Sequence, residues 1–272
     1  MIETIDTIVL PARQRWVVEG VAQGRTLRAI ARGRGIGEET AVRYFRTARR
    51  MLRESSQPHT AVAVAYTYQA ILRPDVHDLG VGVPHGERIL MPLIAQGLPT
   101  SQMADRVKWP AKTVVRLVYD LETRMGARNR AHLITLAWQA GLLTASQMRA
   151  WFDQVDARAL ARTVLAWGKT SARPRAEDVV GAVPRLSRYA YRFAAEVREQ
   201  CLAVPFGTGS AACAQALDVL EEADRLLVPG PPGRQATVEQ ARALARLVFR
   251  LVRASERLAP DLAGLPDLRG LR

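Results

Sequence analysis

The chain has 272 residues, which allows two or three domains, and its 48% content of hydrophobic residues is that of a folded protein. It has no run of 18 apolar residues, and its start lacks the basic segment and apolar stretch of a signal sequence. We therefore expect a cytoplasmic protein without a membrane partner. The net charge is +13, and residues 1–53 hold 11 arginines against five acidic residues. This distribution favours a polyanionic partner, although a solvated basic face has the same composition.

Apolar residues at helical spacing predict α-helices throughout, with no convincing strand pattern. In the first 73 residues we expect helices over 12–23, from a Thr26 cap to about Ala31, over 38–53 and over 60–72. Gly24 and the glycine-rich segment 33–37 separate the first three. In the third helix, four apolar residues are expected to face inward: Val42, Phe45, Ala48 and Leu52.

The same helix order returns from residue 83. Residues 10–53 slid onto 83–126 without a gap give nine identities in 44 positions, at an offset of 73. The identical pairs in the two segments include Pro11 and Pro84, Arg15 and Arg88, Ala22-Gln23-Gly24 and Ala95-Gln96-Gly97, and Val42-Arg43 and Val115-Arg116. Two repeats are too few for a solenoid. We therefore predict two copies of one small domain, over residues 1–73 and 83–143.

In the second copy the expected helices start at Pro84, Thr100, Ala111 and Asn129, and the last ends near Ala140. Two features of this copy are unusual for a pair of helices joined by a tight turn. Pro92 falls inside the first helix, where it removes a backbone donor. The turn Lys108-Trp109-Pro110 offers no Ser or Thr cap to the third helix. These features leave open whether the second copy is a weaker reader or has become partly a structural or partner-binding module.

The region 144–272 does not continue the repeat and is predicted to be a helical C-terminal domain for oligomerisation or partner binding. Helices are expected over about 145–167, 184–204, 210–227 and 238–258, with a short segment near 177–183. A turn is expected at 229–233, and a surface tail from residue 260. Arginines recur on one side of the last helix, which would suit DNA, an acidic partner or solvent: Arg242, Arg246, Arg250, Arg253 and Arg257.

The chain shows no pattern of catalytic or metal-binding residues, so we expect no enzyme activity, no metal and no cofactor. Its four histidines are scattered. Cys201 and Cys213 stand twelve residues apart and are interpreted as small hydrophobic residues. The glycine-containing loop before residue 210 lacks a lysine in register for phosphate binding, and we interpret it as a helix entry capped by Ser210 or Thr208.

Several short motifs recur at matched positions in the two copies. The second copy has Glu87-Arg88, Ala95-x-Gly97, Met103-Ala104, Thr113-Val114-Val115, Met125-Gly126, Asn129-Arg130 and Gly141-Leu142-Leu143. The first has Arg13-Gln14-Arg15, Ala22-x-Gly24, Ile30-Ala31, Thr40-Ala41-Val42 and, more loosely, Ala70-Ile71-Leu72. In this spacing, residues 10–143 resemble the LuxR/GerE (NarL-type) helix-turn-helix DNA-binding domain. The resemblance implies that the third helix of each copy enters the major groove, where base pairs are distinguishable.

The predicted DNA contacts lie on the outward faces of the third helices and, in the second copy, at the start of the fourth helix. The expected base-facing residues are Thr40, Arg43, Arg46, Lys112, Thr113 and Arg116. The expected phosphate contacts are Arg50, Arg53, Arg128 and Arg130. The chain departs from the family where Val42 and Val115 replace a basic residue, and where Tyr44 and Leu117 replace a His-like one. These departures leave two alternatives: the usual contacts are missing, or they are shifted to the neighbouring Arg43 and Arg116.

The sequence thus predicts an all-α, nucleoid-associated transcriptional regulator that binds double-stranded DNA with two tandem helix-turn-helix domains, followed by a helical bundle. Two alternatives stay open: an architectural DNA-binding protein of low specificity, and a module that docks on RNA polymerase or another regulator. A homodimer is also open. The fourth helices either close the core of their own copy or pack the two copies together, so that one chain mimics a dimer.

Overall fold

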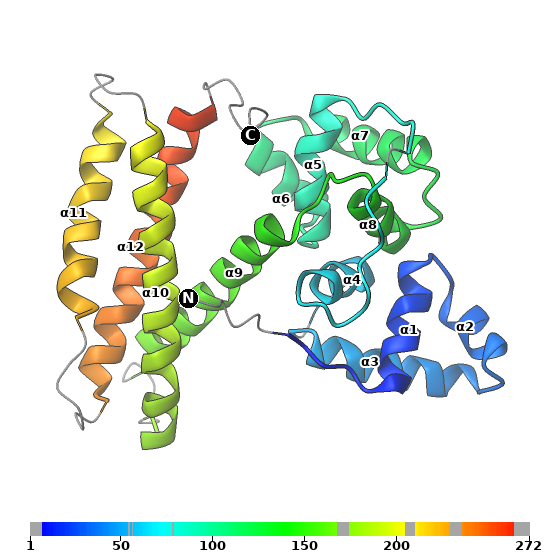
Figure 1. Ribbon diagram of the computed structural model, residues 1–272, viewed down its shortest axis with the longest axis horizontal. Helices are drawn as coiled ribbons and strands as arrows, with labels where there is room; N and C mark the ends of the chain where they lie inside the picture. Colours follow the sequence, from blue (N-terminus) through cyan, green and yellow to red (C-terminus); the bar gives the residue numbers. More distant parts are fainter. Residues whose placement is uncertain are drawn as a thin grey trace. The chain divides into compact units, whose positions relative to one another are not determined.

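The computed structural model describes residues 7–53, 55, 57–77, 79–167, 174–204, 210–228 and 236–263, the last five by their backbone alone. Over these residues the fold is all-α, with twelve helices and no strand (Figure 1). The chain forms two compact units, residues 1–152 and 153–272, and the division falls inside one helix, α9 (Ala145–Ala166). No helix in the described part is both long enough and apolar enough to cross a membrane.

The first unit contains the two sequence repeats, each as four helices. The first copy has α1 (Ala12–Ala22), α2 (Leu27–Gly33), α3 (Glu38–Met51) and α4 (Pro58–Thr67). The second has α5 (His85–Ala95), α6 (Thr100–Val107), α7 (Ala111–Arg124) and α8 (Arg130–Gln139). Thr26 caps α2 as predicted, since its hydroxyl accepts a hydrogen bond from the Ala29 amide at 3.2 Å. The helix predicted to reach Leu72 ends earlier, because Gln69 has a left-handed backbone with φ of 54°.

The two copies share their backbone conformation as well as their sequence pattern. Helices α5, α6 and α7 each begin 73 residues after α1, α2 and α3, whereas α8 begins 72 residues after α4. Left-handed residues occur at matching positions: Gly24 and Gly97, Gly35 and Lys108, Arg53 and Gly126, and Gln69 and Gly141. The link between the third and fourth helices is therefore one residue longer in the first copy. It follows that Gln69-Ala70-Ile71, one residue earlier than predicted, corresponds to the Gly141-Leu142-Leu143 segment.

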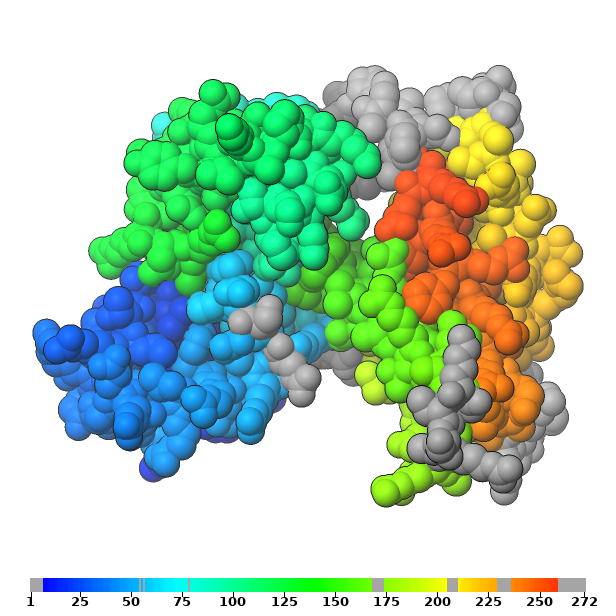
Figure 2. Space-filling view, turned by 180° about the vertical axis from the view of Figure 1, so that it is seen from behind, coloured from blue at the N-terminus to red at the C-terminus, as the bar shows by residue number. Residues whose placement is uncertain are grey.

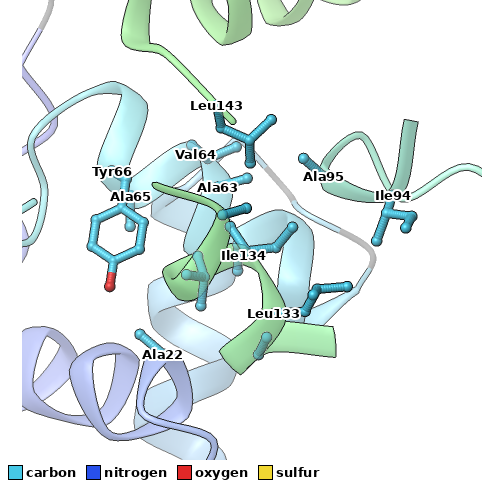
Figure 3. Packing of buried hydrophobic residues seen from close by; sticks show 14 of the residues in the cluster. Ala22, Ala63, Val64, Ala65, Tyr66, Ile94, Ala95, Leu133, Ile134 and Leu143 are labelled. Carbon is cyan, nitrogen blue, oxygen red and sulfur yellow. The ribbon is translucent and has the colours of Figure 1, made fainter. Parts of the chain in front are cut away.

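One hydrophobic core extends through both copies, and α4 lies at its centre. Every residue of α4 from His59 to Thr67 is buried. This helix packs against α8 and α5 of the second copy as well as against α1 of its own. Figure 3 shows Leu133 and Ile134 of α8 within this core, between Ala22 on α1 and Ala95 on α5. The fourth helices therefore join the copies, as one of the two alternatives from the sequence proposed.

The contacts between the copies are reciprocal. Tyr66 and Trp138 occupy equivalent positions in α4 and α8, and their rings contact each other with centroids 5.8 Å apart. Such a contact between equivalent residues is what a two-fold relation produces. A pair of matching contacts flanks it. A Cβ added at Gly24 would lie 3.0 Å from His132 Cβ, and one added at Gly97 would lie 2.3 Å from Thr60 Oγ1.

Polar groups fix this junction further. The Tyr66 hydroxyl lies 3.1 Å from Thr135 Oγ1, which itself donates a hydrogen bond to the Ala22 carbonyl at 2.7 Å. The Asn129 side chain caps α8 and donates to the Gly24 carbonyl at 3.0 Å. Burial raises the pKa of the Tyr66 phenol, so it stays protonated and can donate. These directional bonds hold one relative placement of the copies, which an apolar contact alone would define less well.

The second unit is a helical bundle formed by the later part of α9 with α10 (Ala176–Ala203), α11 (Ala211–Leu226) and α12 (Val238–Ala263). The prediction that a helix begins at Pro184 was wrong, because α10 continues through this proline. Val179, Ala182 and Val183 are buried in the turns before it, and their packing offsets the lost hydrogen bond. Helix α12 also runs past residue 258, where we expected it to end.

The arginine row of α12 mostly serves the bundle itself. Arg242 donates to the Trp167 carbonyl, Arg250 pairs with Glu222, and Arg257 donates to Gln215 Oε1 at 2.7 Å. Arg246 and Arg253 are exposed. Cys201 and Cys213 are free and half-buried, and burial beside Cys213 raises the pKa of the Cys201 thiol to about 11. The loop at 205–209, the turn at 229–233 and the tail after 263 lie outside the described residues.

Replacing Gly97 by Ala should destabilise the chain more than the same change at Gly126. Both glycines are left-handed, with φ of 76° and 65°, so each change costs about 1–2 kcal/mol of backbone strain. A Cβ at Gly126 meets nothing within 4 Å, whereas one at Gly97 overlaps Thr60 Oγ1. We expect a further loss of about 1–3 kcal/mol for Gly97→Ala, measured by urea unfolding.

Thr60→Ala provides the matched second change, because it removes the overlapping hydroxyl. Adding it to Gly97→Ala should recover most of the extra loss. Equal losses for Gly97→Ala and Gly126→Ala would show that the close contact of Gly97 with Thr60 between α5 and α4 does not contribute to the stability of the pair.

Candidate nucleic-acid interface

Each copy contains a short helix, a tight turn and a longer helix, and the longer helix exposes one face. The turns are equivalent, with left-handed backbone at Gly35 in the first copy and Lys108 in the second. The inward residues of the longer helices match one to one: Ala41 with Val114, Phe45 with Val118, and Ala48 with Leu121. The expectation that Val42 faces inward needs correction. Ala41 takes the buried position, and Val42 lies half-buried beside the exposed face.

The exposed face of α3 is rich in charge. Arg43, Arg46 and Arg50 are exposed along it, and Thr40 is half-buried near its start. Carboxylates occupy the first turn, where they suit the positive end of the helix dipole. Together these groups surround a shallow hollow lined by Glu38, Glu39, Val42, Arg43 and Arg46. The face therefore presents hydrogen-bond donors and acceptors side by side, as readout of base edges requires.

An aromatic and basic cluster, here called the Trp16 cluster, adjoins this face. The Trp16 and Tyr44 rings meet edge to face with centroids 6.1 Å apart. Arg34 lies over Trp16 at 5.2 Å, and Arg13 and Arg43 lie over Tyr44 at 6.0 and 5.8 Å. Cation–π contacts hold these guanidinium groups, and Arg13 also donates to the Tyr44 hydroxyl at 3.4 Å. The remaining N–H groups can bind a phosphate. Sequence reasoning missed Arg13 and Arg34, because the cluster joins α1, the turn after α2 and α3 only in the folded chain.

The exposed face of α7 differs in character. Lys112 and Arg116 are exposed and Thr113 is half-buried, as in the first copy. Beside them, however, Val115 is 56% exposed and Tyr119 is 67% exposed. Arg124 is held near the end of the helix by Glu87, a nearly buried carboxylate with which it forms two hydrogen bonds at 3.2 and 3.3 Å. This face is therefore less charged and more apolar than that of α3.

Three of the four arginines predicted to contact phosphates have partners within the protein. The Arg53 guanidinium lies 3.9 Å from the centre of the Tyr68 ring, at the left-handed end of α3, and does not extend outward with Arg50. Arg128 is exposed but donates to the Gln23 carbonyl at 3.4 Å. Arg130 pairs with Glu122 at 3.4 Å. Arg50 thus keeps its predicted place on an exposed helix face, whereas Arg128 links the two copies.

The two copies also differ in charge over equivalent segments. Residues 10–53 carry 11 basic and three acidic side chains, a net charge of +8. Residues 83–126 carry six basic and four acidic side chains, a net charge of +2. The Trp16 cluster has no counterpart in the second copy, where the equivalent positions hold Gly86, Ile89, Val107 and Leu117. The first copy is therefore the stronger candidate for binding a polyanion.

Comparison of the chain with known protein families, with characterised proteins and with solved structures gave no match. A functional interpretation therefore depends on the geometry of these residues. Within the described part of the chain, no group of three or more His, Cys, Asp or Glu side chains could hold a metal ion. The exposed faces of α3 and α7, with the Trp16 cluster, combine charge, hydrogen-bonding groups and the shape of an exposed helix.

Acidification should weaken the junction between the copies through His59. This histidine is buried at the start of α4, and burial together with the nearby Arg130 charge lowers its pKa from 6.5 to about 4. The folded chain therefore binds fewer protons than the unfolded chain below pH 6.5. The contribution of His59 to the free energy of unfolding should be fully present above that pH and be lost, by up to about 3 kcal/mol, as the pH drops to about 4.

Urea unfolding at a series of pH values measures this loss. His59→Gln should flatten part of the pH dependence, while His85→Gln, at an exposed site, should leave it unchanged. The remaining dependence has a second source at the junction, since burial beside Arg128 also lowers the pKa of His132. An unchanged slope in His59→Gln would rule out the assigned role of His59.

Proposed function

We propose that the protein is a sequence-specific, double-stranded DNA-binding transcriptional regulator. The observation that carries the proposal is the pairing of two equivalently built helix–turn–helix units through a reciprocal interface. Each unit exposes one face of its longer helix, and each face carries cationic and hydrogen-bonding side chains. A helix fits the major groove of DNA, and two such units related by a two-fold arrangement suit two half-sites on one duplex.

In this proposal, the first copy supplies most of the affinity. Arg43 and Arg46 face the base edges, where a guanidinium group can donate two hydrogen bonds to one guanine. Arg50 lies further along α3 and contacts phosphates, together with Arg13 and Arg34 from the Trp16 cluster. The contacts of Arg13 and Arg34 with aromatic rings reduce the conformational freedom lost on binding. The second copy contributes Lys112, Thr113 and Arg116, which are the base-facing residues of α7.

The shared core supports a rigid pair rather than two independent binding modules. The copies contact each other through the buried α4 and through hydrogen bonds at Thr135 and Asn129. Figure 2 shows the first copy in blue and the second in green, in direct contact over the surface of the first unit. Two helices fixed in this way reach two half-sites only at one spacing along the duplex.

Selection from a random duplex library at near-physiological salt tests the proposal directly. We expect the full-length chain to enrich a motif with two half-sites at a constant separation. Binding that persists at low salt without an enriched motif would favour an architectural DNA-binding protein instead. The absence of DNA binding would favour a module that docks on RNA polymerase or another regulator.

Two single substitutions on α3 should have different effects on binding. Arg43→Ala should weaken binding to the enriched duplex by about 1–3 kcal/mol and much less on random duplex, because it removes a base contact. Arg50→Ala should weaken binding to both duplexes alike and reduce the salt dependence, because it removes a phosphate contact. Titrations by fluorescence anisotropy at two salt concentrations measure both effects. Equal losses on the two duplexes for Arg43→Ala would contradict its role in base readout.

The separation of the half-sites should be strictly limited. Inserting about five base pairs turns one half-site to the opposite side of the duplex, whereas about ten restore its side but increase the distance. We expect both insertions to reduce affinity to that of a single half-site. Unchanged affinity would show that the two copies bind DNA independently, in spite of their shared core.

A further inference from the structure

An apolar stripe on α7 distinguishes the second helix–turn–helix unit from the first. Val115 and Tyr119 are four residues apart, so they lie one above the other on the same side of the helix. Both are more than half exposed. Lys112, one turn before Val115, and Arg116, beside it, place positive charge along one edge of the stripe. The stripe therefore lies within the surface that the proposed function places in the major groove.

The same positions in the first copy have different chemistry. The counterpart of Tyr119 is Arg46, and that of Lys112 is Glu39. Val115 corresponds to Val42 of α3. Val42 is half-buried, and it lines the shallow hollow together with charged residues. In α3 the exposed groups are thus charged donors and acceptors. In α7 the centre of the face is a valine side chain and an aromatic ring.

Base pairs offer a specific partner for each chemistry. A guanidinium group pairs with the acceptors of guanine, and a carboxylate accepts a hydrogen bond from the amino group of cytosine. An apolar side chain in the major groove contacts the C5-methyl group of thymine, the only apolar group that a base presents there. A valine and a tyrosine ring with two cations along one edge match a thymine-containing half-site next to the phosphate backbone.

We propose that the two copies read unlike half-sites, and that Val115 and Tyr119 recognise thymine methyl groups in one of them. Arg43 and Arg46, with Glu39, read a G·C-rich half-site through α3. This inference rests on the proposed function, because it assigns the bases read by the same two faces. The target is then an asymmetric sequence, on which the protein binds in one orientation.

The distribution of phosphate contacts agrees with this assignment. The first copy has a net charge of +8 over 44 residues and the Trp16 cluster, whereas the second has +2 over its equivalent 44 residues. The first copy can thus bind strongly to the backbone of its half-site. The second copy depends more on burying apolar surface against bases, which is sensitive to the presence of a methyl group.

Deoxyuridine substitution tests the inference. The probe is the duplex enriched by the selection, synthesised with deoxyuridine in place of thymidine in one half-site at a time. This change removes the methyl group and preserves base pairing and charge. We expect the wild-type chain to bind about four-fold more weakly for each contacted methyl group when one half-site is substituted. Substitution of the other half-site should leave the affinity unchanged.

Two variants assign the effect to α7. Val115→Ala and Tyr119→Ser change exposed side chains. Each variant should bind the natural duplex more weakly than the wild type. Each should also show a smaller difference in affinity between the thymine-containing and the deoxyuridine-containing duplex. Val42→Ala is the matched control in the first copy and should retain the full difference. Circular dichroism and urea unfolding check that each variant keeps the stability of the wild type.

The outcomes separate this inference from the proposed function. Three outcomes overturn the inference and leave the proposed function intact, because binding is still sequence-dependent in each. The two half-sites are identical, or the second half-site contains no thymine, or deoxyuridine does not change the affinity. Retention of the full thymine effect in both α7 variants also overturns the inference. The absence of any sequence-dependent binding overturns both.

Discussion

The packing of α4 against α8 is the contact on which the arrangement of both helix–turn–helix units depends. Each copy has too few residues for a large core of its own, and the fourth helix of the first copy, α4, is buried along nearly its full length. Much of this burial comes from the other copy, through α8 and α5. Separation of the copies would expose α4, and we therefore expect the two copies to fold together as one domain.

The contact between the copies is reciprocal: equivalent residues of the two copies contact each other. Tyr66 meets Trp138, its own equivalent, and the ends of α1 and α5 each pack against the start of the fourth helix of the other copy. A self-complementary interface of this kind usually joins two separate chains. Within a single chain it requires no association step, so the spacing between α3 and α7 does not depend on protein concentration.

The sequence predicted the helices of the first unit well, because their signals are local. Proline, glycine and a Thr26 cap mark their ends, and the 73-residue repeat allowed each copy to support the interpretation of the other. Predictions failed where tertiary contacts decide. Pro184 stays inside a helix because its neighbours are buried, and Val42 lies at the edge of the core because Ala41 takes the buried position. Neither outcome follows from periodicity alone.

The candidate site was predicted less completely, for a related reason. Exposed positions on α3 and α7 follow from helical periodicity, so the exposure of Arg43, Arg46, Lys112 and Arg116 was predicted correctly. Whether an arginine is available to a ligand depends on its neighbours in space. The pattern alone did not reveal that Arg53 lies over Tyr68. Nor did it reveal the Trp16 cluster, whose members are separated by up to 31 residues.

Joining two copies in one chain removes a constraint that a homodimer cannot escape. In a homodimer every substitution in the reading helix appears in both half-site contacts, so the two half-sites must stay alike. Here Arg46 and Tyr119 occupy equivalent positions with different chemistry, and so do Glu39 and Lys112. The junction has also diverged, since Tyr66 faces Trp138, but it keeps the reciprocal geometry. The core therefore preserves the two-fold arrangement, while the exposed faces are free to differ.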